Sequence, residues 1–304
     1  MTGKGRNLAA SVRERLRKYA ASGSGGYLLV LQRFAIERLL FRLSESPRRD
    51  DFVLKGAVLL ALWGEQVSRV TRDLDLLGAG PAAPEVIAKR FREILTTRVP
   101  PDGLEFPVET LRASEILAGQ EYVGVRLRLQ AHLEKARIPL QVDVGFGDAV
   151  FPRPKLADFP SLLDAPTPRI LVYPREAVVA EKLHAMVRHG EDNTRAKDFY
   201  DIYVLSSIFR FDGSIQSRAI ASTFSRRSTE LPLAPPVALL PTWYENTDRA
   251  LRWRKYLEKD KLTGAPADLR KVGARTIEFL WPPLSALGSE KVFTADWQPG
   301  GPWK

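Results

Sequence analysis

Apolar residues recur with a helical period in some parts of the chain and form short or alternating runs in others. The helical spacing predicts helices over residues 6–20, 28–44 and 84–97, and a further helix that begins at Gly56. The shorter runs predict strands around Asp73–Leu77 and near residues 105–111, 122–131, 139–145 and 169–173. The pattern after the last strand is mainly helical.

A small mixed sheet that is interrupted by helices and followed by a helical half is typical of the α+β class. We therefore expect N-terminal helices and the sheet within residues 1–150, and a mainly helical region over residues 151–304. A chain of 304 residues, of which 44% are hydrophobic, can bury a large core as one extended domain or as two.

Two acids interrupt the apolar strand around Asp73–Leu77. Residues i and i+2 of a strand point to the same face about 7 Å apart, so Asp73 and Asp75 would present paired carboxylates, which suit a divalent metal. The helix start at Gly56 would suit a phosphate, and the two features together indicate a nucleoside triphosphate site. A solvated acidic edge strand fits the same pattern, and Arg69 or Arg72 could neutralise the acids instead.

A third acid, Asp143, lies at the centre of the strand predicted near residues 139–145. A metal pair that holds both the attacking and the leaving oxygen usually needs more than two carboxylates, and a neighbouring strand is a natural donor. The alternative is that Asp143 faces solvent on an alternating strand.

A second polar cluster follows in the helical half. Lys182 lies beside the apolar stripe of a helix that begins after Pro174, and Asp198 and Asp201 share one face of the next helix because they are three residues apart. A lysine at such a margin usually extends to solvent. Acids on an adjacent helix could instead hold it in place, and a fixed lysine suits a triphosphate.

These motifs, in this order, resemble those of the AbiE-type nucleotidyltransferase toxins of the DNA polymerase β-like superfamily, which include mycobacterial toxins that add nucleotides to transfer RNA. The resemblance runs from about Val53 to Leu205, and the strand around Asp143 also looks like its counterpart in that family. The motifs are Lys55 with Gly56, Thr71 to Asp75 (TRDLD), Glu181 to Leu183 (EKL) and Arg195 to Asp201 (RAKDFYD).

The resemblance implies that Asp73 and Asp75 bind metal, with Asp143 as a third acid that could help to deprotonate a 3′ hydroxyl. It implies that Lys182 contacts the triphosphate and that Asp198 orients Lys182 or the nucleotide. It further implies two Mg²⁺ ions, a nucleoside triphosphate as substrate, and nucleotide contacts from four residues near the acidic strand, which are Lys55, Gly56, Thr71 and Arg72. The family often has a second glycine or a small hydroxyl residue where this chain has Ala57 and Val58. Thr71 or backbone N–H groups would therefore have to make the phosphate contact of that hydroxyl.

Composition narrows the class of protein. The absence of cysteine excludes disulfides, thiolate zinc sites and cysteine catalysis. No apolar run approaches the roughly 20 residues of a membrane span, so we expect a cytoplasmic protein. The three histidines lack the spacing of a zinc pair and are interpreted as structural.

The net charge of +10 is concentrated towards the two ends of the sequence. Residues 1–50 hold 11 Lys or Arg against 4 Asp or Glu, and residues 249–275 hold 9 against 3. Basic ends favour a bound polyanion, although a solvated basic surface would have the same composition. Trp253 and Tyr256 interleave with basic residues and could stack bases or pack a helix.

The leading hypothesis is a toxin of a toxin–antitoxin system that transfers a nucleoside monophosphate to an RNA 3′ end, with transfer RNA as the foremost acceptor, and so blocks translation. A toxin would have a cognate antitoxin protein as partner. The alternatives are a nucleotidyltransferase that acts on a protein or small-molecule hydroxyl, and a degenerate relative that only binds nucleic acid.

Overall fold

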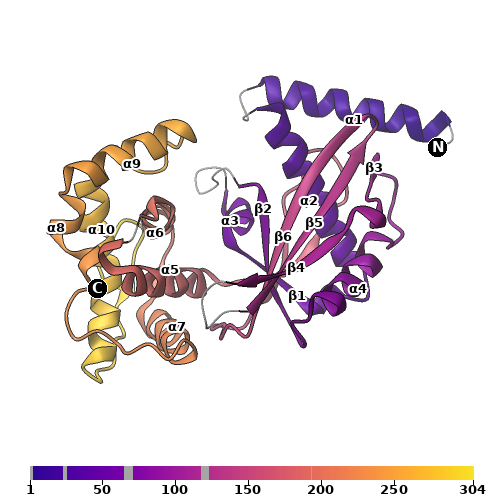
Figure 1. Cartoon of the computed structure of the whole chain (residues 1–304). Helices are drawn as coiled ribbons and strands as arrows, with labels where there is room; N and C mark the ends of the chain where they lie inside the picture. Colours follow the sequence, from indigo (N-terminus) through magenta and orange to yellow (C-terminus); the bar gives the residue numbers. More distant parts are fainter. Residues whose placement is uncertain (1–2, 23–25, 65–70, 118–122, 193) are drawn as a thin grey trace. The chain divides into compact units, whose positions relative to one another are not determined.

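The computed structural model describes residues 3–22, 26–64, 71–117, 123–192 and 194–304, and side chains within these ranges except those of residues 3–7, 117 and 123. The chain forms two compact units (Figure 1). Unit 1 comprises Met1–Trp63, Val70–Gly147 and Lys155–Val172, and unit 2 comprises Gly64–Arg69, Asp148–Pro154 and Tyr173–Lys304.

Unit 1 is built on a mixed β-sheet. Its strands are β1 (Phe52–Lys55), β2 (Asp73–Gly78), β3 (Leu104–Glu105), β4 (Arg112–Leu117), β5 (Val123–Leu133), β6 (Ala136–Phe146), β7 (Lys155–Asp158) and β8 (Arg169–Val172). They lie in the order β3-β5-β6-β2-β1-β8-β7, and β4 also pairs with β5. The pairs β2–β6 and β1–β8 are parallel and the other pairs are antiparallel. The α+β expectation is therefore confirmed.

Helices α2 and α4 cover one face of this sheet. The α-helices of unit 1 are α1 (Gly3–Ala21), α2 (Tyr27–Glu45), α3 (Gly56–Leu59) and α4 (Pro84–Leu95), and the 3₁₀ helices are η1 (Arg49–Asp51), η2 (Leu60–Trp63) and η3 (Val108–Thr110). Helix α2 contacts β6 and β8, α4 contacts β4 and β5, and the two helices contact each other (Figure 1). The side chains that lie between these two helices and the sheet form the core of unit 1.

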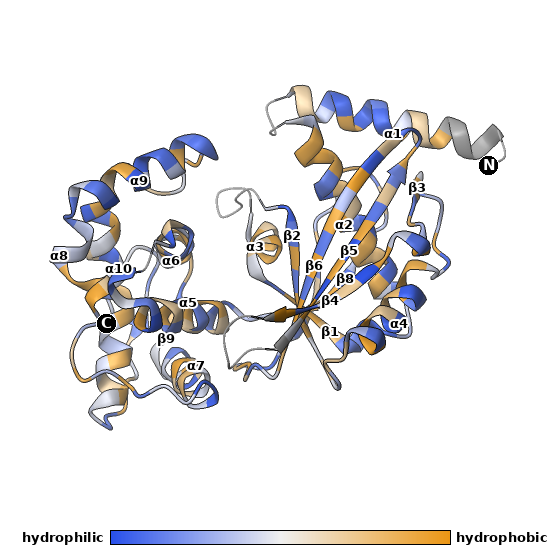
Figure 2. Ribbon diagram, in the orientation of Figure 1, coloured by the Kyte–Doolittle hydropathy of each residue, from blue (hydrophilic) through white to orange (hydrophobic). Residues whose placement is uncertain are grey.

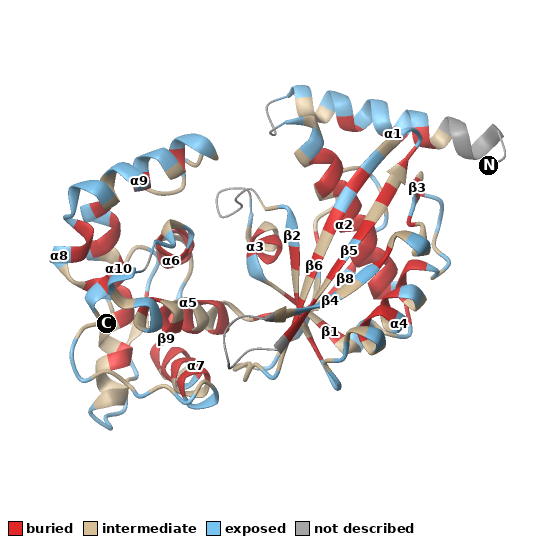
Figure 3. Cartoon of the chain, in the orientation of Figure 1, coloured by how far each residue is buried: buried red, intermediate tan, exposed pale blue. Residues whose placement is uncertain are grey.

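Side chains alternate between this core and the opposite face along each strand, as Figures 2 and 3 show for β5 and β6. Leu74 and Leu76 on β2 and Val142 and Val144 on β6 are almost fully buried. The intervening positions are polar, so the face away from α2 and α4 carries the chemistry.

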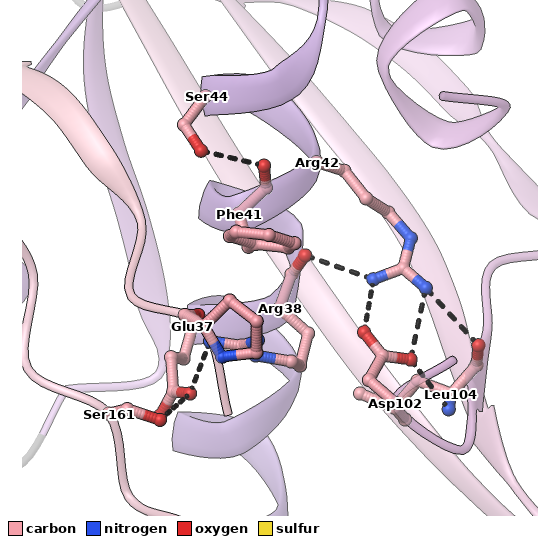
Figure 4. Close-up of polar contacts among 9 residues, drawn as sticks. Glu37, Arg38, Phe41, Arg42, Ser44, Asp102, Leu104 and Ser161 are labelled. Atoms are coloured by element: carbon pink, nitrogen blue, oxygen red, sulfur yellow. Dashed lines mark hydrogen bonds and ion pairs between the residues drawn. The ribbon is translucent and has the colours of Figure 1, made fainter. Parts of the chain in front are cut away.

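Helix α2 buries three charged residues, Glu37, Arg38 and Arg42, and each of them has a fixed partner (Figure 4). Arg42 donates two hydrogen bonds to the Asp102 carboxylate, at 2.7 and 3.1 Å. Glu37 pairs with Arg38 at 2.6 Å and accepts a hydrogen bond from the Ser161 hydroxyl. Burial raises the pKa of Glu37, while the neighbouring Arg38 opposes that rise. These contacts fix α2 to loops on both sides of it.

Unit 2 is mainly helical. Its helices are α5 (Arg175–His189), η5 (Gly190–Asp192), α6 (Ala196–Ile208), α7 (Gly213–Arg226), η6 (Val237–Leu239), α8 (Pro241–Tyr244), α9 (Thr247–Lys259) and α10 (Leu269–Gly288), and its strands are β9 (Phe211–Asp212) and β10 (Asp296–Trp297). Aromatic rings pack its core: Phe279 lies against Phe211, Trp297 and Trp303 with centroids 4.9 to 5.6 Å apart.

The structure corrects two local predictions and adds strands. The strand predicted near residues 105–111 is wrong, because only Leu104–Glu105 is a strand, Pro107 follows it, and η3 leads to β4. The helix predicted from Gly56 is a single α turn that continues as η2. The segment Lys155–Val172, beyond residue 150, adds β7 and β8 to the sheet of unit 1.

Candidate active site

Strand register aligns four charged residues across the polar face of the sheet. Lys55 on β1 lies opposite Asp75 on β2. Asp75 lies opposite Asp143 on β6, and Asp143 lies opposite Arg126 on β5. Directly opposed residues of neighbouring strands point to the same face. The face therefore carries a row of two carboxylates between two cations.

Asp73 begins the next row on the same face. It lies two residues before Asp75 on β2 and opposite Gln141 on β6. Asp73 is exposed, whereas Asp75 and Asp143 are half-buried and the intervening Leu74 is buried. The prediction that β2 is a buried strand with its acids on one face is confirmed, and the register brings Asp143 to that face.

Gly56 leaves the room that the Asp75 carboxylate occupies. Its φ is +70°, and a Cβ added there would overlap the Asp75 side chain. Only glycine meets both conditions without strain. Because α3 has four residues, it supplies little helix dipole, and the packing of Gly56 against Asp75 is the clearer reason for a glycine at this position.

Arg126 is the cation that neutralises the third acid. Its Nε and Nη2 donate to the two carboxylate oxygens of Asp143 at 2.8 and 2.7 Å, a two-point geometry that is stronger than a single contact. The Asp143 hydrogen bond raises the pKa of Arg126, and the charges of Asp73 and Asp75 add to that effect. Three carboxylates therefore act on one guanidinium.

This pair differs from the salt bridge that the sequence left open, in which Arg69 or Arg72 would neutralise Asp73 and Asp75, because Arg126 holds Asp143. Arg72 is exposed and has no ion pair within the described part of the chain, and Arg69 lies outside it. Among the described residues, no three His, Asp or Glu side chains are grouped to hold a metal ion as they stand. The side chains on this face are nevertheless hard carboxylate oxygen donors, the kind that Mg²⁺ prefers.

The predicted nucleotide-binding residues lie at the ends of β1 and β2 that meet Gly56. Lys55 ends β1, Gly56 follows it, and Arg72 precedes β2. Thr71 uses its hydroxyl to donate a hydrogen bond to the backbone carbonyl of Asp73 at 3.2 Å. The Thr71 hydroxyl thus helps to shape the entry to β2.

Lys182 on α5 belongs to unit 2, where two aspartates of α6 hold its ammonium group. Its Nζ lies 3.0 Å from Asp198 Oδ1 and 2.6 Å from Asp201 Oδ2, and Arg195 Nε donates to Asp198 Oδ2 at 2.6 Å. The Lys182 side chain is 15% exposed and the two aspartates 1%. Lys182 therefore does not extend into solvent; the acids on α6 hold it.

The electrostatics of this lysine cluster favour ionised acids. Burial by itself would raise the pKa of Asp198, but the charges of Lys182 and Arg195 outweigh burial and hold that pKa below its usual value. An ammonium with two buried carboxylates has a fixed position and orientation.

Sequence reasoning missed Arg126. The signal was available in the hairpin of β5 and β6, which pairs Leu133 with Ala136 and so sets every later pair, including Arg126 with Asp143. A two-residue turn recognised at Glu134 and Lys135 would have set this register and so predicted the pair of Arg126 with Asp143.

The two basic ends of the sequence differ in how far acidic partners neutralise their cations. Most of the cations in residues 1–50 whose side chains the structure describes form ion pairs, among them Arg13 with Glu134, Arg15 with Asp164, Arg42 with Asp102 and Arg48 with Glu93. On α9, three exposed cations have no hydrogen bond or ion pair within the described residues; these are Arg252, Arg254 and Lys255. Trp253 is 1% exposed and donates its Nε1 to the Pro266 carbonyl, so it packs the helix.

Comparison with known families decides the class of protein. The model of the nucleotidyl transferase AbiEii toxin family, from type IV toxin–antitoxin systems, matches residues 38–275. The chain belongs to this family. As an AbiEii member it is a nucleotidyltransferase that uses a nucleoside triphosphate, and the toxin–antitoxin system implies a cognate antitoxin.

Two solved structures are similar to the chain at low identity. JHP933 from Helicobacter pylori has a TM-score of 0.44 and 14% identity, over 86% of this chain and 92% of that one. A provisionally assigned nucleotidyltransferase from H. pylori has a TM-score of 0.39 and 15% identity, over 86% and 93%. No curated protein matches the chain. In the described part of the chain, none of the helices combines the length and the apolar character that a membrane span requires.

Proposed function

We propose that this AbiEii protein transfers a nucleoside monophosphate to the 3′ hydroxyl of an RNA, with transfer RNA as the foremost acceptor, and that Mg²⁺ bound by Asp73 and Asp75 assists the reaction. The observation that carries the proposal is the register of β2 and β6, which aligns Asp75 with Asp143 and keeps Asp73 on the same face. Paired carboxylates on one face are the ligand set that a metal-assisted phosphoryl transfer requires.

Bound Mg²⁺ would stabilise the charge that develops on the reacting phosphate and on the leaving pyrophosphate. In the transfer, the 3′ oxygen of RNA bonds to the α-phosphorus, and the bond between that phosphorus and the oxygen bridging to the β-phosphate breaks. The Asp143 carboxylate, when Arg126 no longer holds it, accepts the proton of the hydroxyl. Both carboxylate oxygens of Asp143 accept hydrogen bonds from Arg126, so release of Asp143 belongs to the proposed reaction.

Nucleotide contacts are proposed for two groups of residues. Lys55, Gly56, Thr71 and Arg72 flank the acidic face of unit 1. Lys182 is proposed to contact the triphosphate, and Asp198 is proposed to orient its ammonium group. The support for Lys182 is its order in the family motifs and the two aspartates that fix it. A preorganised cation stabilises a developing phosphate charge more than a mobile one does.

The direct test incubates the protein with total RNA, Mg²⁺ and each of the four α-labelled triphosphates in turn. We expect label in the small-RNA fraction with at least one triphosphate. Label on a protein or small molecule would identify the other acceptor class. The absence of labelled RNA with all four triphosphates, from folded protein, would contradict the proposal.

A further inference from the structure

A second row of polar residues crosses the same sheet face beside the carboxylates. Arg112 on β4 lies opposite Arg128 on β5, Arg128 lies opposite Gln141 on β6, and Gln141 lies opposite Asp73 on β2. Neighbouring strands are about 4.8 Å apart, so the row extends roughly 14 Å from Arg112 to Asp73. We call the residues Arg112, Arg128 and Gln141 the basic platform.

The charges of this platform are not neutralised by acids. Arg112 is exposed and donates to the backbone carbonyls of Glu109 and Leu111, which leaves its positive charge uncompensated. Arg128 is exposed and has no hydrogen bond or ion pair within the described residues. This differs from the N-terminal cations, such as Arg13 and Arg42, which carboxylates neutralise.

Two arginines without acidic partners, in line with the carboxylates proposed to bind metal, complement the charge of a phosphate backbone. We infer that the basic platform binds the phosphodiester backbone of the single-stranded 3′ end of the acceptor RNA and leads its terminal hydroxyl to Asp73 and Asp75. This inference rests on the proposed function and adds to it the surface that holds the acceptor.

The side chains of the platform determine which part of an RNA it can recognise. Arginine recognises phosphate oxygens through a planar fork of donors, whereas the Gln141 amide donates to Asp143 Oδ2 at 3.4 Å and so links the platform to the carboxylates. The platform carries no Phe, Tyr or Trp on which a base could stack. It therefore positions an RNA strand without selecting its sequence.

The test uses a short single-stranded RNA with a free 3′ hydroxyl and the double variant Arg112→Gln/Arg128→Gln. RNA affinity is measured by fluorescence anisotropy at several salt concentrations, without triphosphate. Each lost phosphate contact lowers the slope of log K against log salt by about 0.7 for a single strand, so the double variant should lose about 1.4. Triphosphate affinity, measured separately, should stay unchanged.

The matched control is Arg92→Gln/Arg98→Gln, which removes the same charge on and just after α4, at the helix-covered side of unit 1. The control should keep the wild-type slope. An unchanged slope in the platform variant, or an equal loss in the control, would overturn the inference. A loss of triphosphate affinity with intact RNA affinity would also overturn it, because the arginines would then hold the nucleotide. Failure of the proposed function shows instead as absence of label transfer, which these binding measurements do not involve.

Discussion

Arg126 on β5 holds both carboxylate oxygens of Asp143 on β6, through donors 2.8 and 2.7 Å away. The β5–β6 hairpin fixes this pair, because the two strands stay in register from Leu133 and Ala136 to Gly124 and Gly145. Asp143 also lies opposite Asp75, so the arginine keeps two neighbouring carboxylates from repelling each other. A metal that recruits Asp143 must compete with Arg126.

The first prediction concerns Arg126→Gln. Without metal the variant should be less stable than wild type by about 1–3 kcal/mol, because hydrogen bonds between charged groups are lost and Asp143 faces Asp75 uncompensated. Added Mg²⁺ should raise its melting temperature more than that of wild type, because no arginine competes for Asp143. Thermal unfolding with EDTA and with Mg²⁺ measures both effects. Equal Mg²⁺-induced shifts in the two proteins would show that Asp143 takes no part in metal binding.

The second prediction concerns Gly56→Ala. The new Cβ would displace the Asp75 carboxylate, and the φ of +70° adds strain of roughly 1–2 kcal/mol. We expect a modest loss of stability and a loss of transfer activity. Gly190→Ala is the control, since Gly190 also has a positive φ, +48°, but open space around it. If both variants lose activity to the same degree, the contact with Asp75 is not the reason.

The third prediction separates folding from chemistry at Lys182. Lys182→Met leaves Asp198 and Asp201 buried without their shared cation and should destabilise the protein by about 3–5 kcal/mol in urea unfolding. The triple variant Lys182→Met/Asp198→Asn/Asp201→Asn removes the uncompensated charges and should regain much of that stability. It should remain inactive, because the proposed triphosphate contact is gone. Full activity in the triple variant would assign Lys182 a structural role only.

The fourth prediction concerns the exposed cations of α9. Replacing Arg252, Arg254 and Lys255 by Glu should weaken RNA binding and flatten its salt dependence, since these side chains have no acidic partners in the described chain. Triphosphate binding should change little. A wild-type salt slope in the variant would mean that α9 presents a solvated basic surface.

Part of this architecture was predictable from local sequence. The apolar run of β2 is interrupted by two acids and that of β6 by one, and α4 has a clear periodic stripe. The three-residue spacing of Asp198 and Asp201 also placed both acids on one face of α6. In each case the signal lies within one element.

The features that escaped prediction depend on pairing between segments or on sheet edges. β4 pairs only with β5 and carries exposed Arg112, Ser114 and Glu115, so its sequence lacks a clear alternation. The pairing of Arg126 with Asp143 depends on the register of the β5–β6 hairpin. The neutralisation of Arg13 depends on Glu134, which is 121 residues away in the sequence. Composition counts charges but does not show which of them are paired.

The central claim is that nucleotidyl transfer occurs at the carboxylates of β2. The measurement that tests it most directly is the rate of label transfer from the accepted α-labelled triphosphate to RNA by wild type and by Asp75→Asn, at saturating Mg²⁺ and with equal folded fractions. Asp75→Asn would remove a carboxylate ligand of the proposed Mg²⁺ and with it the stabilisation of the charge that develops on the phosphate, so the rate should fall by about 100-fold or more. Transfer by Asp75→Asn at the wild-type rate would contradict the assignment of the site.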